Sequence, residues 1–155
     1  MIVNDQHVTA LRSFLLDDYE VWSQKIENLI ASDNAENYGI LIHAAFTRAA
    51  YRKFSPSWSL PDVIRFVGEV RSSVGADARE IDALVAEKLL RQSIGDESVK
   101  ADELAGVDVQ TIATAESTLL LAMVHDADLD EVGVEEFIKD ATMHANKWLA
   151  AREAE

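Results

Sequence analysis

Apolar residues recur at spacings of three and four along nearly the whole chain, and this periodicity constrains the fold more than any other feature of the sequence. The first segment shows it in the series Val8, Leu11, Leu15, Tyr19, Trp22, Ile26 and Leu29. This spacing places apolar side chains on one face of an α-helix, whereas a half-buried strand alternates at every second residue. No segment alternates over a convincing length. The sequence therefore predicts an all-α protein.

Short polar stretches separate the helical segments. The first segment runs from about residue 5 to residue 31, which is long for a globular helix, and Asp17 and Asp18 offer a break. The second, residues 35–54, is apolar on most sides and should lie centrally in the bundle. Further helices are expected at residues 60–74, 77–93, 108–125 and 134–151. Because a chain of 155 residues usually forms one domain, we predict a compact bundle of five to six helices in a single domain, residues 1–155.

Several helix ends are marked by local signals. Ser59, followed by a proline and an acid, is a typical N-cap, and Gly75 should end the helix that begins there. The stretch Asp77-Ala78-Arg79-Glu80 is similar to a capping box and predicts the next start, and Asp108 should cap the helix after it. The inward residues expected of these two later helices are Ile81, Leu84, Val85, Leu89, Val109, Ile112, Ala113, Leu119, Leu120 and Met123.

The net charge of −14 is unevenly distributed. Residues 1–47 carry a net charge of −5, residues 48–91 carry +2, and residues 92–155 carry −11. A net field of this sign repels nucleic acid and anionic membranes at long range and favours basic partners. The charge therefore disfavours nucleic acid as the main partner.

The residue content excludes several kinds of site. The chain has no cysteine, which excludes disulfides, thiolate nucleophiles and cysteine-based metal sites. No apolar run approaches the length of about 18 residues that a transmembrane helix needs. The first residues do not combine a basic stretch with an apolar one, as a signal peptide would. We therefore expect a cytoplasmic protein that does not enter a membrane.

The block from Trp58 to Asp96 carries a family resemblance. Its two characteristic stretches are LPDVIRFVGEVR, residues 60–71, and VAEKLLRQSIGD, residues 85–96. The block covers about a quarter of the chain and resembles an uncharacterised all-helical family of high-GC bacteria. The resemblance implies a bacterial cytosolic helical protein, and because that family has no known activity it implies no functional residue.

The segment from His125 to Glu131 holds four carboxylates and an imidazole in seven residues. Against the pattern of a calcium-binding EF-hand, Asp126, Asp128 and Asp130 match the first three ligand positions, and Glu136 comes one residue before the closing glutamate. Glu131 stands where the pattern requires glycine. These four residues are the candidate ligands for calcium or another divalent cation. The alternative is a solvated turn in which Asp130 caps the next helix.

The same segment permits a second metal hypothesis. The adjacent pair His125 and Asp126 could be ligands in a helical HD-type phosphohydrolase, with His43 and either Asp140 or His144 completing the set. Nothing in the spacing forces these residues together. Histidines at such positions are more often hydrogen-bonded core residues than catalysts.

The relatively basic region, residues 48–79, offers a nucleic-acid alternative. Its cations are Arg48, Arg52, Lys53, Arg65, Arg71 and Arg79. A helix-turn-helix reader would present such arginines on a recognition helix. However, acids alternate with bases along residues 80–91, which is typical of an ordinary solvated face.

Aromatic residues near the predicted turns favour a binding role. Trp58 lies in a turn, and Tyr51 and Phe54 lie at the end of a helix, where they could form an apolar patch. The basic middle could also dock onto the acidic last third of another copy. We therefore predict a non-enzymatic module for protein–protein interaction, with a homodimer as one form, and with no required cofactor.

Overall fold

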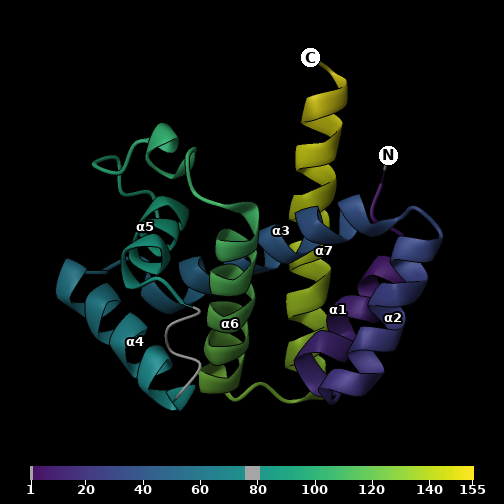
Figure 1. Ribbon diagram of the computed structural model, residues 1–155, viewed down its shortest axis with the longest axis horizontal. Coiled ribbons are helices and arrows are strands. Elements are labelled where there is room, and N and C mark those ends of the chain that lie inside the picture. The colour runs from purple at the N-terminus through teal and green to yellow at the C-terminus, as the bar shows by residue number, and fades with distance from the viewer. Residues whose placement is uncertain (1, 76–80) are drawn as a thin grey trace. The chain divides into compact units, whose positions relative to one another are not determined.

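The structure, a computed structural model, describes residues 2–75 and 81–155 and is all-helical over those ranges, without strands (Figure 1). The described residues form seven α-helices and one short 3-10 helix. Their bounds are α1 (Asp5–Leu16), α2 (Tyr19–Ala31), α3 (Ala35–Phe54), α4 (Leu60–Ser73), α5 (Ala83–Ser93), η2 (Ala101–Leu104), α6 (Val109–Ala127) and α7 (Glu131–Glu153).

The all-α prediction is confirmed, but the predicted number of five to six helices is too low. The difference arises at Asp17 and Asp18, where the first apolar segment divides into α1 and α2. Both residues have extended backbone, and the Asp18 carboxylate accepts a hydrogen bond from the Val21 amide at 3.2 Å. Because an aspartate at an N-cap satisfies a free amide of the next helix, two short helices replace one long one.

The chain divides into two compact units. Unit 1 consists of residues 1–45 and 129–155, and unit 2 of residues 46–128. The first boundary falls within α3, so that α3 contributes residues to both units. The single domain expected from chain length stays a prediction, and the two units are described separately below.

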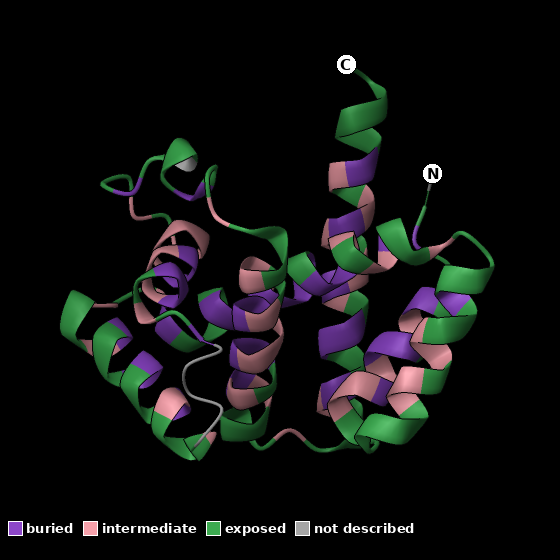
Figure 2. Cartoon of the chain, viewed as in Figure 1, coloured by how far each residue is buried: buried purple, intermediate pink, exposed green. Residues whose placement is uncertain are grey.

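Unit 1 is built from α1, α2, the first half of α3, and α7. α1 and α2 pack side by side, and α1 also packs on α7. The α1–α7 pair is antiparallel, because the Val3 amide donates to Asn146 Oδ1 while Arg12 bonds to Glu135. The buried faces of these helices are visible in Figure 2. The buried residues of unit 1 include Leu11, Leu29, Leu41, Phe137, Ile138, Ala141 and Leu149.

Unit 2 is built from the second half of α3, α4, α5, η2 and α6. The helices α4, α5 and α6 pack on one another around an apolar interior. Most of the residues expected inside are buried, but Leu84 and Val109, at 57% and 80% exposure, are not, and Ala113 is also exposed. These three predictions are wrong. Leu84 and Val109 lie in the first turns of their helices, where neighbouring elements cover less of the surface.

The predicted helix ends are confirmed where they depend on local capping. The Ser59 hydroxyl accepts from the Asp62 amide at 3.3 Å, and Asp108 caps α6. Gly75 has a left-handed φ of +60°, which favours glycine and follows the end of α4. The expected capping box at residues 77–80 lies outside the described residues. The N-cap of α5 is Asp82, whose carboxylate accepts from the Val85 amide.

None of the helices that the structure describes is both long enough and apolar enough to cross a membrane.

Candidate functional site

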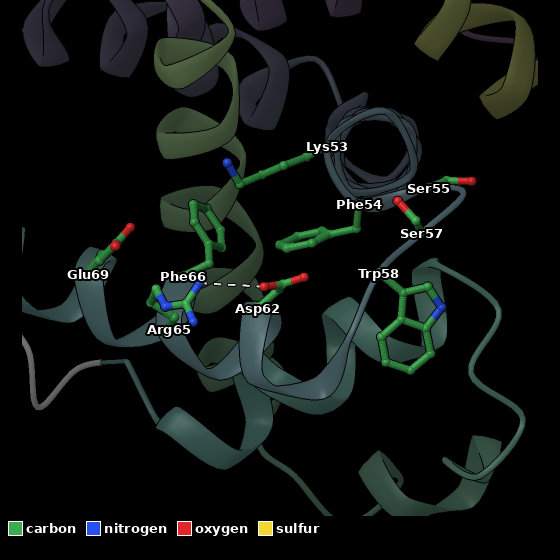
Figure 3. A pocket seen from close by; sticks show the side chains of 9 residues that line it. All are labelled: Lys53, Phe54, Ser55, Ser57, Trp58, Asp62, Arg65, Phe66 and Glu69. Carbon is green, nitrogen blue, oxygen red and sulfur yellow. Dashed lines mark hydrogen bonds and ion pairs between the residues drawn. The ribbon is translucent and has the colours of Figure 1, made fainter.

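A pocket of about 420 Å³ lies in unit 2 where α3 ends and α4 begins (Figure 3). Its walls come from three consecutive pieces of chain: the last turn of α3, the turn that follows it, and the first three turns of α4. Charged, hydroxyl and aromatic side chains all contribute. The lining residues are Lys53, Phe54, Ser55, Ser57, Trp58, Asp62, Arg65, Phe66 and Glu69.

Local sequence positions these side chains. α3 ends at Phe54, and the Ser55–Pro56 peptide bond in the following turn is cis. The Ser59 cap then starts α4, so that Asp62, Phe66 and Glu69 follow at helical spacing. The phenyl rings of Phe54 and Phe66 meet edge to face with centroids 5.7 Å apart, which ties the end of α3 to α4.

Lys53 occupies an unusual position above this aromatic pair. Its ammonium nitrogen lies 4.7 Å from the centroid of the Phe66 ring and 5.8 Å from that of Phe54. The same nitrogen lies 3.6 Å from the carboxylate of Asp126. Ring faces attract cations, and the side chain of Lys53 is about one-third exposed, so its charge is held at the pocket wall rather than free in solvent.

The second cation of the pocket is Arg65. Its guanidinium lies 3.5 Å from the Asp62 carboxylate, one turn earlier on α4, and its side chain is largely exposed (Figure 3). A single contact of this length at the surface contributes little stability. Arg65 can therefore leave Asp62 and bind an incoming carboxylate with little loss of stability. Glu69 lies beyond Arg65, and Trp58 lies at the opposite end of the pocket in Figure 3.

The lining set favours recognition over catalysis. Serine hydroxyls become nucleophiles when a base such as histidine lies within hydrogen-bond distance, and the lining contains no histidine. It offers instead two cations held in weak surface pairs, two carboxylates, two hydroxyls and an indole ring. The cations and the indole of such a set can bind carboxylates and apolar side chains.

The carboxylates of the acidic segment have separate local roles. Asp126 pairs with Lys53, and Asp128 ends α6 in a left-handed conformation with φ of 49°. Asp130 is the N-cap of α7, and its carboxylate accepts from the Gly133 amide at 2.7 Å. The capping role expected for Asp130 is confirmed, while the fourth candidate, Glu136, lies exposed on α7.

Within residues 2–75 and 81–155, no group of three or more histidines and acids is arranged to hold a metal. A divalent cation on Asp126, Asp128, Asp130 and Glu136 stays a prediction.

The residues of the phosphohydrolase hypothesis have local partners. The imidazole of His43 lies against the indole of Trp148, with ring centroids 5.4 Å apart. His144 Nε2 lies 3.4 Å from the Asp140 carboxylate, one turn earlier on α7. His125 is exposed in the last turn of α6. These contacts are those of helix-surface and core-edge histidines.

The described cations of residues 48–79 have different contacts. Arg48 lies over the ring of Tyr51, 5.0 Å from its centroid. The Arg71 guanidinium donates to the carbonyl oxygen of Ile81 at 3.0 Å and so fixes the chain before α5. Arg79 lies outside the described residues. Lys53 and Arg65 are the members of this set that line the pocket.

Sequence reasoning missed the buried histidine of unit 1. His7 is fully buried, its Nδ1 accepts from the Asn4 amide at 3.0 Å, and its Nε2 lies 2.8 Å from the Asn34 carbonyl oxygen. Because a carbonyl can only accept, Nε2 carries the proton and donates. The available signal was an asparagine three residues before the histidine at a helix start, which forms a capping box.

Comparison of the chain with protein families, with curated proteins and with solved structures finds no match. The interpretation of the pocket therefore rests on its own geometry.

Proposed function

We propose that this protein is a non-enzymatic module for protein–protein interaction, and that the pocket of unit 2 receives an acidic segment of its partner. The observation that carries the proposal is the state of the two cations in the pocket. Lys53 is held over the Phe66 ring and Arg65 is largely exposed, and both are paired with carboxylates only by contacts of 3.5–3.6 Å. Each cation can therefore accept a carboxylate that approaches more closely.

The neighbouring side chains support a peptide rather than a small anion alone. The indole of Trp58 lines the same pocket as the two cations, and tryptophan is among the residues that contribute most to protein interfaces. The exposed Leu60 and Ile64 lie on the same first turns of α4. An acidic segment with an apolar residue beside its carboxylates would match this combination.

A protein partner also suits the charge of the chain better than a nucleic acid does. With a net charge of −14, the chain repels a polyanion at long range, whereas a short acidic segment can contact Lys53 and Arg65 by displacing the nearby carboxylates of Asp126 and Asp62. Favourable contacts are therefore confined to the pocket and its surroundings.

A titration with an oligoglutamate peptide, followed by nuclear magnetic resonance, tests the proposal. At low ionic strength the peptide should shift the amide signals of residues 53–69 and the indole signal of Trp58, and added salt should reverse the shifts. Arg65→Glu should weaken binding about tenfold. The matched control is Arg152→Glu, which reverses a similarly exposed arginine in unit 1 and should leave binding unchanged.

Three outcomes would contradict the proposal. One is an absence of shifts at the pocket at low ionic strength. Another is equal weakening by Arg65→Glu and Arg152→Glu, because that would indicate a general charge effect. The third is tighter binding of a DNA oligonucleotide than of oligoglutamate at the same residues, which would favour the nucleic-acid alternative instead.

A further inference from the structure

A second surface lies in unit 1, along the outside of α7. It is a groove of about 800 Å³ between α7 and α1, lined mainly by apolar groups. Val132 and Met143 of α7 are 66% and 49% exposed there, and Val8 lines the groove from α1. Val132 and Met143 stand about three helical turns apart, and exposed apolar side chains along a groove mark a surface that a partner can cover.

The groove residues on α7 form a regular stripe. Val132, Glu136, Lys139 and Met143 follow one another at spacings of four, three and four, which places them on one face of the helix. The opposite face is buried and carries Val134, Phe137 and Ala141. Residues at this spacing lie along one side of the helix, which a second helix lying alongside would contact, and here the two apolar residues flank two opposite charges.

The stripe is self-complementary when α7 meets a second copy of itself in the antiparallel direction. With a two-fold axis passing between positions 137 and 138, Val132 lies opposite the partner's Met143, and Glu136 lies opposite the partner's Lys139. The same two pairs recur on the other side of the axis. Each apolar residue thus meets an apolar residue, and each charge meets its opposite.

We propose that the α1–α7 groove is the interface of a homodimer with two-fold symmetry, in which the α7 helices of two copies pack antiparallel. The Arg12–Glu135 pair, with contacts of 2.6 and 2.9 Å, holds α1 against α7 at the edge of the groove. Glu135 is thereby occupied within its own copy, which leaves Glu136 and Lys139 to pair between copies. This surface belongs to unit 1 and is independent of the pocket proposed in unit 2.

Charge reversal across the symmetry axis tests this arrangement. Glu136→Lys and Lys139→Glu should each weaken dimerisation of the full chain at least about tenfold in sedimentation equilibrium, because each places like charges opposite one another twice. The double variant should restore the wild-type dimer. An equimolar mixture of the two single variants should form a heterodimer, since every cross pair then joins opposite charges. The matched control is Glu20→Lys on α2, which should have no effect.

The outcomes separate clearly. Restoration in both the double variant and the mixture supports the two-fold interface. A wild-type chain that stays monomeric from micromolar to millimolar concentration overturns it, and so does a dimer that neither single variant weakens or that the double variant does not restore. Circular dichroism of each variant checks folding. Should a charge variant unfold, Val132→Gln combined with Met143→Gln replaces it, and a dimer that survives this change also overturns the interface.

Discussion

Unit 1 and unit 2 are both built from packed helices, but they differ in how their polar groups are bonded. In unit 1, hydrogen bonds join segments far apart in the sequence: Val3 to Asn146, His7 to Asn34, and Trp22 to Tyr38. Around α5 in unit 2 the hydrogen bonds from Arg91 to Asp96 and from Gln92 to Lys100 span five and eight residues, and the ion pair of Lys88 with Glu103 spans fifteen. Lys53 with Asp126 is a long-range pair of unit 2, but it lies near the surface.

The difference indicates how each unit is specified. A buried donor or acceptor that loses its partner costs about 1–3 kcal/mol, whereas an exposed pair contributes about 0–1 kcal/mol. The long-range bonds of unit 1 therefore penalise incorrect docking of its segments. Polar substitutions should be costly in unit 1 and mild around α5, and the following predictions test that contrast.

The largest effect is expected for His7→Leu in unit 1. Leucine fills most of the space but leaves the Asn4 amide and the Asn34 carbonyl without their partners. Urea denaturation should show a loss of about 3 kcal/mol in the free energy of unfolding. His7→Gln should lose less, because glutamine can still accept from the N-cap amide. Equal losses for both variants would mean that packing, and not hydrogen bonding, is responsible.

The next effect should appear at alkaline pH. Burial raises the pKa of Tyr38 to about 12 from an ordinary value of 10.0, although the hydrogen bond from Trp22 partly opposes this shift. The folded state favours the neutral phenol. The contribution of Tyr38 to the free energy of unfolding is therefore complete below pH 10, and it is lost as the pH rises towards 12. The loss should approach about 2–3 kcal/mol. A Tyr38→Phe variant should lack this part of the alkaline destabilisation, and an unchanged alkaline profile would contradict the assignment.

Matched caps in the two units give a smaller effect. Asp130 caps α7 and Asp82 caps α5, each by accepting a backbone amide. Asp130→Ala and Asp82→Ala should each lower the free energy of unfolding by about 1 kcal/mol, with Asn or Ser tolerated at either position. Similar losses would show that capping is local and independent of the unit.

Thermal denaturation with and without calcium tests the metal prediction. The prediction gains support if calcium raises the melting temperature only while Asp126, Asp128, Asp130 and Glu136 are intact.

The smallest effect is expected at Asp96 near α5. Hydrogen bonds from the Ser98 hydroxyl and from Arg91 hold the pKa of Asp96 below its ordinary value of 3.8. A lowered folded-state pKa contributes stability above the unfolded value and loses it as the pH falls below that range. Asp96→Asn should therefore change stability slightly at neutral pH and flatten the acid limb of the stability profile. If Asp96→Asn lowered the free energy of unfolding as much as His7→Leu does, polar substitutions would not be milder around α5 than in unit 1.

The pocket in unit 2 was only partly predictable. The sequence marked Lys53 and Arg65 as cations and Trp58 as an aromatic in a turn, but it assigned them to different hypotheses. Phe66 fits the helical spacing of a core residue, and it is buried while also supporting the Lys53 ammonium. The packing of Phe54 on Phe66 brings these residues to one pocket, and no pattern along the chain states that the two rings meet.

The sequence by itself determined the all-helical class and many of the helix ends, because periodicity and capping depend on residues within a few positions of each other. The residues that begin or end helices act on backbone within one turn of their own position, as Asp17, Ser59, Gly75, Asp108 and Asp130 do. Only the tertiary structure decided that His7 is buried, that Lys53 is held over two rings, and that Val132 and Met143 face an open groove. Those facts depend on which distant segments pack together, because the shapes and buried faces of whole helices determine which helices meet.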